Sequence, residues 1–354
     1  MTIHLPYIQT LLDDSAIAHI MINGWQQVFI EKEAGGMDNI PTPFHNEDEL
    51  MALIHAIAGV KLSEAQPIVS FRLSDGVLVD IALPPVSVLG PAVTIRKPAA
   101  RELTLENLIE YKTLTPKAAD FLRVCVEARV NIVVSGGASS GKITLTKIIA
   151  GWIPRDERIL LLLDNGKPGL AHPHLLVLET RPPNQEGKGE VTMRQLVQCA
   201  LRMRPDRIIV TELCGAETTE ILDGINHGYD GAILCMQSNG PRDTLARLER
   251  MDALGNPEVP LLQLREQIAS SIDLIVHQER LRDGSRRIVN ICEVTGMDQG
   301  VVTLSDIFYF SQTGFENGLV QASLMTTGLI PRFMKKLDEM GRGLPLSFFT
   351  TGEV

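Results

Sequence analysis

Short apolar runs separated by turn residues fill the first hundred positions of the chain. Residues 17–23 are largely apolar, Gly24 follows, and apolar residues return at 27–30, which predicts a β-hairpin. Within 48–60 the apolar residues recur at helical spacing, which predicts a helix. Strands are predicted at 68–73, 77–83 and 92–96. These elements together predict a small α+β domain over residues 1–97.

The pattern of apolar and polar residues changes near residue 103. Helical stretches there alternate with short, wholly apolar runs, such as those at 132–134 and 159–163. Strands that alternate with helices indicate a parallel sheet covered by helices on its faces. We therefore predict an α/β domain over residues 113–354, joined to the first domain by a linker at 98–112.

Composition and charge narrow the classes of function. Of 354 residues, 44% are hydrophobic and 21% are charged, which is ordinary for a globular protein. The net charge of −10 disfavours nucleic acid as a partner, because phosphate binding needs a surplus of Lys and Arg. No apolar run approaches the roughly 18 residues of a membrane span, and the N-terminus lacks a secretory signal pattern. We expect a cytoplasmic protein. Its five cysteines, interpreted as buried thiols, are Cys125, Cys199, Cys214, Cys235 and Cys292.

A glycine-rich turn follows the apolar run at 131–135 and precedes a helical pattern. It reads Gly136-Gly137-Ala138-Ser139-Ser140-Gly141-Lys142, the G-x-x-x-x-G-K spacing of a phosphate-binding loop. Such a loop points backbone N–H groups at an anion, and the next helix adds the partial positive charge of its N-terminus. A plain tight turn between strand and helix is the alternative, which the strand and helix around the loop make less favourable. We predict an ATP or ADP site, with Lys142 as the phosphate cation.

The residue after the lysine departs from this pattern. Magnesium-dependent sites use a Ser or Thr hydroxyl there as a metal ligand, and Ile143 has no oxygen. Thr144 is next, but one residue is a rotation of about 100° on a helix, so its hydroxyl should face away from the metal. We therefore predict that magnesium binds weakly or not at all, and we predict no metal-ligand set.

Two acids end predicted strands of the second domain. Glu212 follows the apolar run at 207–210, and Asp164 follows the run at 159–163. Ligands gather at the carboxyl ends of strands in open α/β sheets, where an acid can orient or polarise an attacking water. Glu212 and Asp164 are therefore the candidate catalytic residues.

Further segments of the chain match a family pattern together with the glycine loop. They are 94–97, 178–184, 201–207, 241–249, 293–297 and 306–308. These segments resemble the type II/IV secretion system ATPases, and among these most closely the tight-adherence (Tad/CpaF-type) pilus assembly ATPases. The likeness extends from about Leu11 to the C-terminus. It implies a small N-terminal domain, a RecA-like P-loop NTPase domain, ATP bound between them, a hexameric ring, and work on an inner-membrane platform at its cytoplasmic side.

The departures from the family pattern lie where the chemistry takes place. Ala138, Ser139 and Ile143 interrupt a loop that usually reads GGTGSGKTT. The acidic box, usually E-D-x-x-E-L, matches Leu163, Asp164, Lys167 and Pro168, so two of its three acids are absent.

Further substitutions affect single positions of the family pattern. Gln237 stands at the usual histidine, Cys214 at a usual arginine and Thr211 at a usual glycine. In the N-terminal domain, Arg72 and Arg96 match arginines that reach the nucleotide, whereas Leu78 replaces a third.

Three functions fit these observations to different degrees. The substitutions at catalytic positions of the family pattern favour a paralogue in which ATP hydrolysis is impaired. Such a paralogue would act in a homo-hexamer or in a mixed ring with an intact paralogue. A fully active motor of the same system is the main alternative. A small-molecule kinase also uses a phosphate loop, but the N-terminal domain and the segment 201–207 disfavour it. Four arginines are interpreted as a solvated hairpin surface or a subunit contact: Arg280, Arg282, Arg286 and Arg287.

Overall fold

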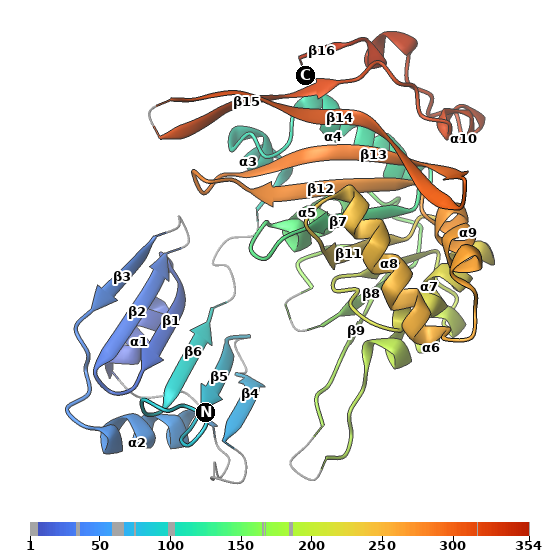
Figure 1. The fold of residues 1–354 in the computed structure, drawn as a ribbon. Coiled ribbons are helices and arrows are strands. Elements are labelled where there is room, and N and C mark those ends of the chain that lie inside the picture. The colour runs from blue at the N-terminus through green and yellow to red at the C-terminus, as the bar shows by residue number, and fades with distance from the viewer. Residues whose placement is uncertain are drawn as a thin grey trace. The chain divides into compact units, whose positions relative to one another are not determined.

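The chain forms two compact units, Met1–Glu102 and Leu103–Val354. The computed structural model, drawn in Figure 1, describes residues 6–32, 36–58, 67–73, 76–97, 103–164, 166, 168–183, 187–316 and 318–353. Residues 98–102 of the predicted linker lie outside the described residues. The rest of the segment 98–112 includes a helix, α3 (Leu105–Glu110), that belongs to the second unit. The limits 1–97 and 113–354 stay predictions.

The first unit is an antiparallel sheet packed against helices. Its strand order is β3-β2-β1-β6-β5-β4, and β1 and β2 form the predicted hairpin, with Ile22 opposite Val28. Buried side chains of α2 share one apolar core with those of β1 and β6. The elements are α1 (Pro6–Asp13), β1 (Ile17–Asn23), β2 (Gln27–Lys32), β3 (Met37–Ile40), α2 (Glu47–Ala58), β4 (Ile68–Arg72), β5 (Leu78–Ala82) and β6 (Ala92–Arg96).

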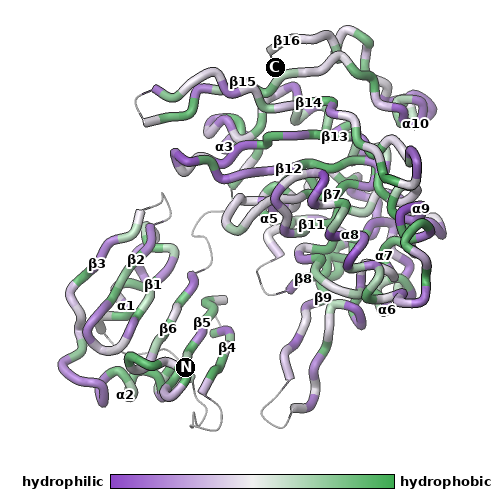
Figure 2. Tube along the Cα trace, viewed as in Figure 1, coloured by the Kyte–Doolittle hydropathy of each residue, from purple (hydrophilic) through white to green (hydrophobic). Residues whose placement is uncertain are grey.

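The second unit contains one ten-stranded mixed sheet, in the order β16-β15-β14-β13-β12-β7-β11-β10-β8-β9. The six strands from β12 to β9 run parallel, as predicted. They are β7 (Ile132–Gly136), β8 (Ile159–Leu163), β9 (Leu175–Glu179), β10 (Arg207–Val210), β11 (Ile233–Gln237) and β12 (Leu274–Arg280). Every residue of β7, β8 and β10 is buried, as expected for strands covered on both faces. Figure 2 colours the chain by hydropathy, from purple for hydrophilic to green for hydrophobic residues.

The other half of the sheet is antiparallel, whereas the sequence pattern predicts a parallel sheet and one hairpin. The hairpin is predicted from the turn Asp283-Gly284 between residues 273–280 and 287–292, and β12 and β13 form it. The connections explain the difference: Gln299-Gly300 alone joins β13 to β14, too short for the crossover that parallel strands need. These strands are β13 (Arg286–Asp298), β14 (Val301–Glu316), β15 (Leu319–Thr326) and β16 (Gly352–Glu353).

Helices cover both faces of the parallel half and create two cores. Side chains of α4, α5 and α10 contribute to one core, and those of α6, α7, α8 and α9 to the other. Threonine side chains cap α3, α4 and α6 at their N-termini. The remaining helices are α4 (Pro116–Glu127), α5 (Lys142–Ala150), α6 (Met193–Arg202), α7 (Glu217–Asn226), α8 (Pro241–Gly255), α9 (Leu261–Ser271), α10 (Met334–Glu339) and the 3₁₀ turn η1 (Leu346–Phe349).

A buried arginine joins four segments at the amino end of the parallel strands. Arg207, the first residue of β10, is 1% exposed and forms an ion pair with Glu157. Its Nη2 donates to the carbonyl oxygen of Val126 at 2.7 Å, and its Nη1 donates to that of Gly231 at 3.2 Å. Because a buried charge is stable only when paired and hydrogen-bonded, these contacts depend on one another.

Two local expectations need correction. The sequence of 330–340, with Pro331 near its start, predicts a helix, but the helix begins four residues later, as α10, because a turn follows Pro331. Three cysteines are buried as expected, but Cys199 is half-buried and Cys214 is exposed, because Cys214 lies in the loop after β10. In the described parts of the chain, no helix combines the length and apolar character that crossing a membrane requires.

Candidate functional site

The glycine loop lies at the carboxyl end of β7, and its first glycine is required by space. A Cβ on Gly136 would lie 2.2 Å from the carbonyl oxygen of Gln278 and 2.5 Å from Oγ of Ser140. Gly141 has a φ of +92°, which favours glycine, and α5 begins directly after it. Ser139 has a φ of +58°, a conformation that costs a non-glycine residue about 1 kcal/mol. The loop therefore keeps the glycine-type turn even though serine replaces the family's glycine at 139.

Two polar side chains of the loop, those of Ser140 and Lys142, are buried. Lys142 is 7% exposed, and its Nζ donates to the carbonyl oxygen of Gly137 at 3.2 Å. Ser140 is 1% exposed, and its Oγ has no hydrogen-bond partner within the described structure. A buried hydroxyl without a partner is costly, and a bound anion would satisfy it. The loop thus fits a nucleotide phosphate, for which Gly137, Ala138 and Ser139 supply partly or fully exposed backbone.

The position after the lysine does not fit the usual magnesium ligand. Ile143 is 37% exposed at the first turn of α5 and offers only carbon atoms. Thr144 is half-buried on the same turn. Over the ranges that the structure describes, no group of three or more His, Cys, Asp or Glu residues is arranged to hold a metal ion.

The candidate acids lie at the same edge of the sheet as the loop. Burial raises the pKa of Glu212, the positive charge of Lys142 opposes this rise, and the negative charge of Asp164 adds to it. The fold therefore brings these three side chains, distant in sequence, within electrostatic reach of one another. Asp164 is exposed and accepts a 2.6 Å hydrogen bond from Oγ1 of Thr180.

Two of the acidic-box positions, Leu163 and Asp164, lie in different environments. Leu163 is 2% exposed and belongs to an apolar core, so the position of the family's first acid points into the protein. Asp164 is at the edge, and Lys167 lies outside the described residues, as does Asn184 of the segment 178–184.

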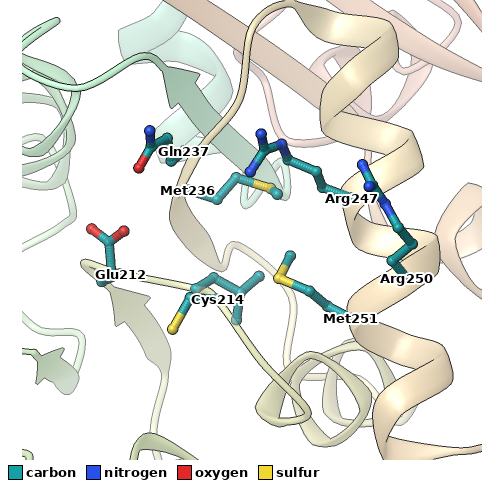
Figure 3. A pocket seen from close by; sticks show the side chains of 8 residues that line it. Glu212, Cys214, Met236, Gln237, Arg247, Arg250 and Met251 are labelled. Carbon is teal, nitrogen blue, oxygen red and sulfur yellow. The ribbon is translucent and has the colours of Figure 1, made fainter.

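An open pocket of about 250 Å³ adjoins Glu212 (Figure 3). Gln237, the exposed last residue of β11, pairs in register with Gly136 of the loop strand. In Figure 3, Glu212 and Gln237 lie on one side of the pocket, and Arg247 and Arg250 of α8 lie on the other. The pocket therefore has carboxylate, amide and guanidinium groups around its opening, and its lining is completed by Leu213, Cys214, Met236 and Met251.

The candidate arginines of the first unit are arranged in a row. Arg72 of β4 pairs in register with Leu78 of β5, which in turn pairs with Arg96 of β6. Directly paired residues project from the same face of a sheet. Leu78 thus stands between two arginines at the position where the family pattern has a third.

The hairpin arginines were only partly understood from sequence. Nε of Arg286 donates to the carbonyl oxygen of Ser139 at 3.0 Å, so this residue contacts the glycine loop and is not merely a solvated surface group. Nη1 of Arg287 donates to the carbonyl oxygen of Tyr111 at 2.8 Å. Sequence reasoning also missed Gln278, which is 1% exposed beside the loop. No sequence pattern marks Gln278, because its place beside the loop follows from the pairing of β12 with β7.

His277 is a further buried polar group beneath the loop. Its Nδ1 lies 2.8 Å from Oγ of Ser135 on β7, and its Nε2 lies 3.5 Å from Oε1 of Glu279. Burial lowers the pKa of His277 to about 4, although the charge of Asp243 opposes this shift. His277 is therefore neutral near pH 7 and supports the loop strand without adding charge.

Comparison with known proteins assigns the family. Residues 4–314 match the type II/IV secretion system protein family, so the chain belongs to that family. A putative conjugal transfer protein of Mycobacterium tuberculosis is 33% identical over 295 residues, which cover 80% of this chain and 82% of the relative. The type IV secretion system protein VirB11 of Bartonella henselae is 29% identical over 326 residues, which cover 80% of this chain and 90% of VirB11.

A solved structure agrees with the fold. The ATPase DotB of Yersinia pseudotuberculosis superimposes with a TM-score of 0.59 at 15% identity, covering 83% of this chain and 80% of DotB. The fold class is thus confirmed: an antiparallel N-terminal sheet unit precedes an α/β unit of the kind found in secretion ATPases.

Proposed function

We propose that this protein is a nucleotide-binding ring component of a tight-adherence (Tad/CpaF-type) secretion or pilus assembly system in which ATP hydrolysis is impaired. The observation that carries the proposal is the intact phosphate loop followed by Ile143. Family membership and the names of the relatives, which concern conjugal transfer and type IV secretion, support the secretion context. The finer tight-adherence assignment is supported by the motif resemblance alone.

Each site residue has a definite task in this proposal. The backbone of 136–141 and Nζ of Lys142 hold the phosphates of ATP or ADP. Glu212, helped by Asp164, orients the attacking water, and Arg72 and Arg96 neutralise phosphate charge from the N-terminal domain. Magnesium, when bound, would stabilise the charge that develops on the phosphates, but residue 143 cannot hold it.

The alternative is a fully active motor. It is favoured by Glu212, because burial raises the pKa of this acid toward the range of a useful general base. Against it stand Ile143 and Gln237, which remove a metal ligand and a group that titrates near neutral pH.

Steady-state turnover of purified protein, with calorimetry of ATP binding in the presence and absence of magnesium, separates the two functions. We expect ATP binding that changes little with magnesium, together with turnover well below the about 1 per second typical of such enzymes. Turnover at or above that rate would establish the active motor instead.

Ring assembly is the second part of the proposal. We expect a homo-hexamer or inclusion in a mixed ring with a catalytically intact paralogue, acting at the cytoplasmic face of inner-membrane platform proteins. Light scattering over a concentration series, with and without ATP and with the intact paralogue added, measures the assembly. A monomer under all of these conditions would contradict the ring.

A further inference from the structure

The hairpin of β12 and β13 places an arginine against the phosphate loop. Arg286 is the first residue of β13, and its Nε donates to the carbonyl oxygen of Ser139 at 3.0 Å. Its Cδ is so close to Gly141 that a Cβ on this glycine would lie 3.1 Å away. The sheet order explains this contact: β12 pairs with β7 and lies between β7 and β13, as Figure 1 shows, so the hairpin of β12 and β13 lies next to the loop that follows β7. The guanidinium therefore lies beside the backbone that would receive a phosphate.

A second arginine faces the same side of the hairpin. Arg280 and Arg286 are directly opposite in the β12–β13 register, and both are exposed. Opposed residues in such a pair have Cβ atoms about 5 Å apart, and like charges there destabilise the sheet. The acids nearby do not relieve this repulsion. Glu279 is next to Arg280 on β12, so its side chain projects from the opposite face of the strand. Asp283 accepts hydrogen bonds from Ser285 and from the backbone N–H of Val320. An anion between the arginines and the loop would relieve it.

Buried polar atoms next to Arg286 also lack partners. Oγ of Ser140 and Oε1 of Gln278 are both buried, and neither accepts or donates a hydrogen bond within the described residues. Nε2 of Gln278 would lie 3.0 Å from a Cβ on Gly141, so this amide is at the same turn of the loop as Arg286. The loop, Gln278 and Arg286 together form a polar site that the protein's own groups leave unsatisfied.

We propose that Arg286 is a nucleotide-binding residue that contacts the phosphate chain. This inference rests on the proposed nucleotide site. The guanidinium, now hydrogen-bonded to Ser139 through Nε only, has its Nη groups available for phosphate oxygens, which it can bind as a fork. Arg286 then supplies positive charge at the phosphates in a site where Ile143 weakens the hold on magnesium.

The test compares Arg286→Gln with Arg282→Gln, which removes the same charge from the exposed turn of the same hairpin. Calorimetry with ATP, ADP and AMP gives the affinities. We expect Arg286→Gln to weaken ATP and ADP binding by about tenfold and AMP binding much less, and Arg282→Gln to leave all three unchanged. Arg286→Lys should recover part of the ATP affinity, because it restores the charge but not the fork. Thermal unfolding without nucleotide should show that both glutamine variants are folded.

Each other result overturns the inference in a defined way. Equal ATP affinity in Arg286→Gln and the unmodified protein would remove Arg286 from the site. Equal losses for ATP and AMP would place Arg286 at the base or sugar. If Arg286→Lys bound ATP as weakly as Arg286→Gln, Arg286 would act only by holding the backbone of Ser139 in place. If the unmodified protein binds no adenine nucleotide, the proposed function itself fails.

Discussion

Replacing Lys142 by alanine is expected to weaken ATP binding by about a hundredfold or more. Lys142 carries the loop's own cation, and a charge-assisted hydrogen bond to phosphate contributes about 1.5–3 kcal/mol, so the loss of two such bonds reaches this size. In the structure Nζ of Lys142 already lies within the loop, 3.2 Å from the carbonyl oxygen of Gly137. Calorimetry with ATP and ADP measures the effect.

The matched control is Lys147→Ala, which removes one positive charge from the same helix about one turn further on. Its ATP affinity should equal that of the unmodified protein. Because Lys142 is buried, thermal unfolding of Lys142→Ala must show a folded protein before its affinity is interpreted. A folded Lys142→Ala variant that binds ATP normally would refute the phosphate site.

Restoring the missing hydroxyl is expected to create magnesium dependence. Ile143→Thr places an oxygen at the first turn of α5, and Ile143→Val gives a side chain of the same shape without one. We expect magnesium to strengthen ATP binding of the threonine variant by about tenfold and to have little effect on the valine variant. Position 143 is 37% exposed, so neither change should disturb a core. Equal magnesium responses in the two variants would show that residue 143 does not approach the ion.

ATP turnover should rise more when two family residues are restored together than when either is restored alone. Gln237→His returns a titrating group to the exposed end of β11, and with Ile143→Thr it should raise turnover by more than the product of the single effects, because catalytic groups act together. Leu163→Glu is a poorer choice than the family pattern implies. Leu163 packs in an apolar core, and a glutamate there would be desolvated. A gain in the double variant no larger than the product of the two single gains would contradict the cooperation.

The parts of the fold that were foreseen are those with strong local signals. The hairpin of 17–30 has a glycine turn between apolar runs, and the strand of 159–163 is apolar without interruption, so both elements are as predicted. The antiparallel half of the second sheet was mostly missed. Its long strands mix buried and exposed positions irregularly, as in β14, and bulges shift the register, so no simple alternation marks them.

The site shows a similar division between local and tertiary information. The loop at 136–142 could be read directly, because its spacing is contained in seven neighbouring residues. The contact of Arg286 with Ser139 joins positions 147 residues apart and follows only from the placement of β12 beside β7. The burial of Leu163 likewise depends on which helices cover the sheet. Chemistry at one turn was therefore predictable, whereas its surroundings required the fold.

The buried arginine at the amino end of the sheet has a consequence for motion. Arg207 ties Glu157, Val126 and Gly231 to β10, and separating Glu157 from it would leave a buried charge unpaired, at a cost of about 3–5 kcal/mol. At the opposite end, Lys142 and Arg286 are each held by a single hydrogen bond to a loop carbonyl. The amino ends of the parallel strands in the second unit are thus held more firmly than the side chains at their carboxyl ends. Rearrangements that accompany ligand exchange should therefore take place at the carboxyl ends of the parallel strands, while the amino ends stay together as one body.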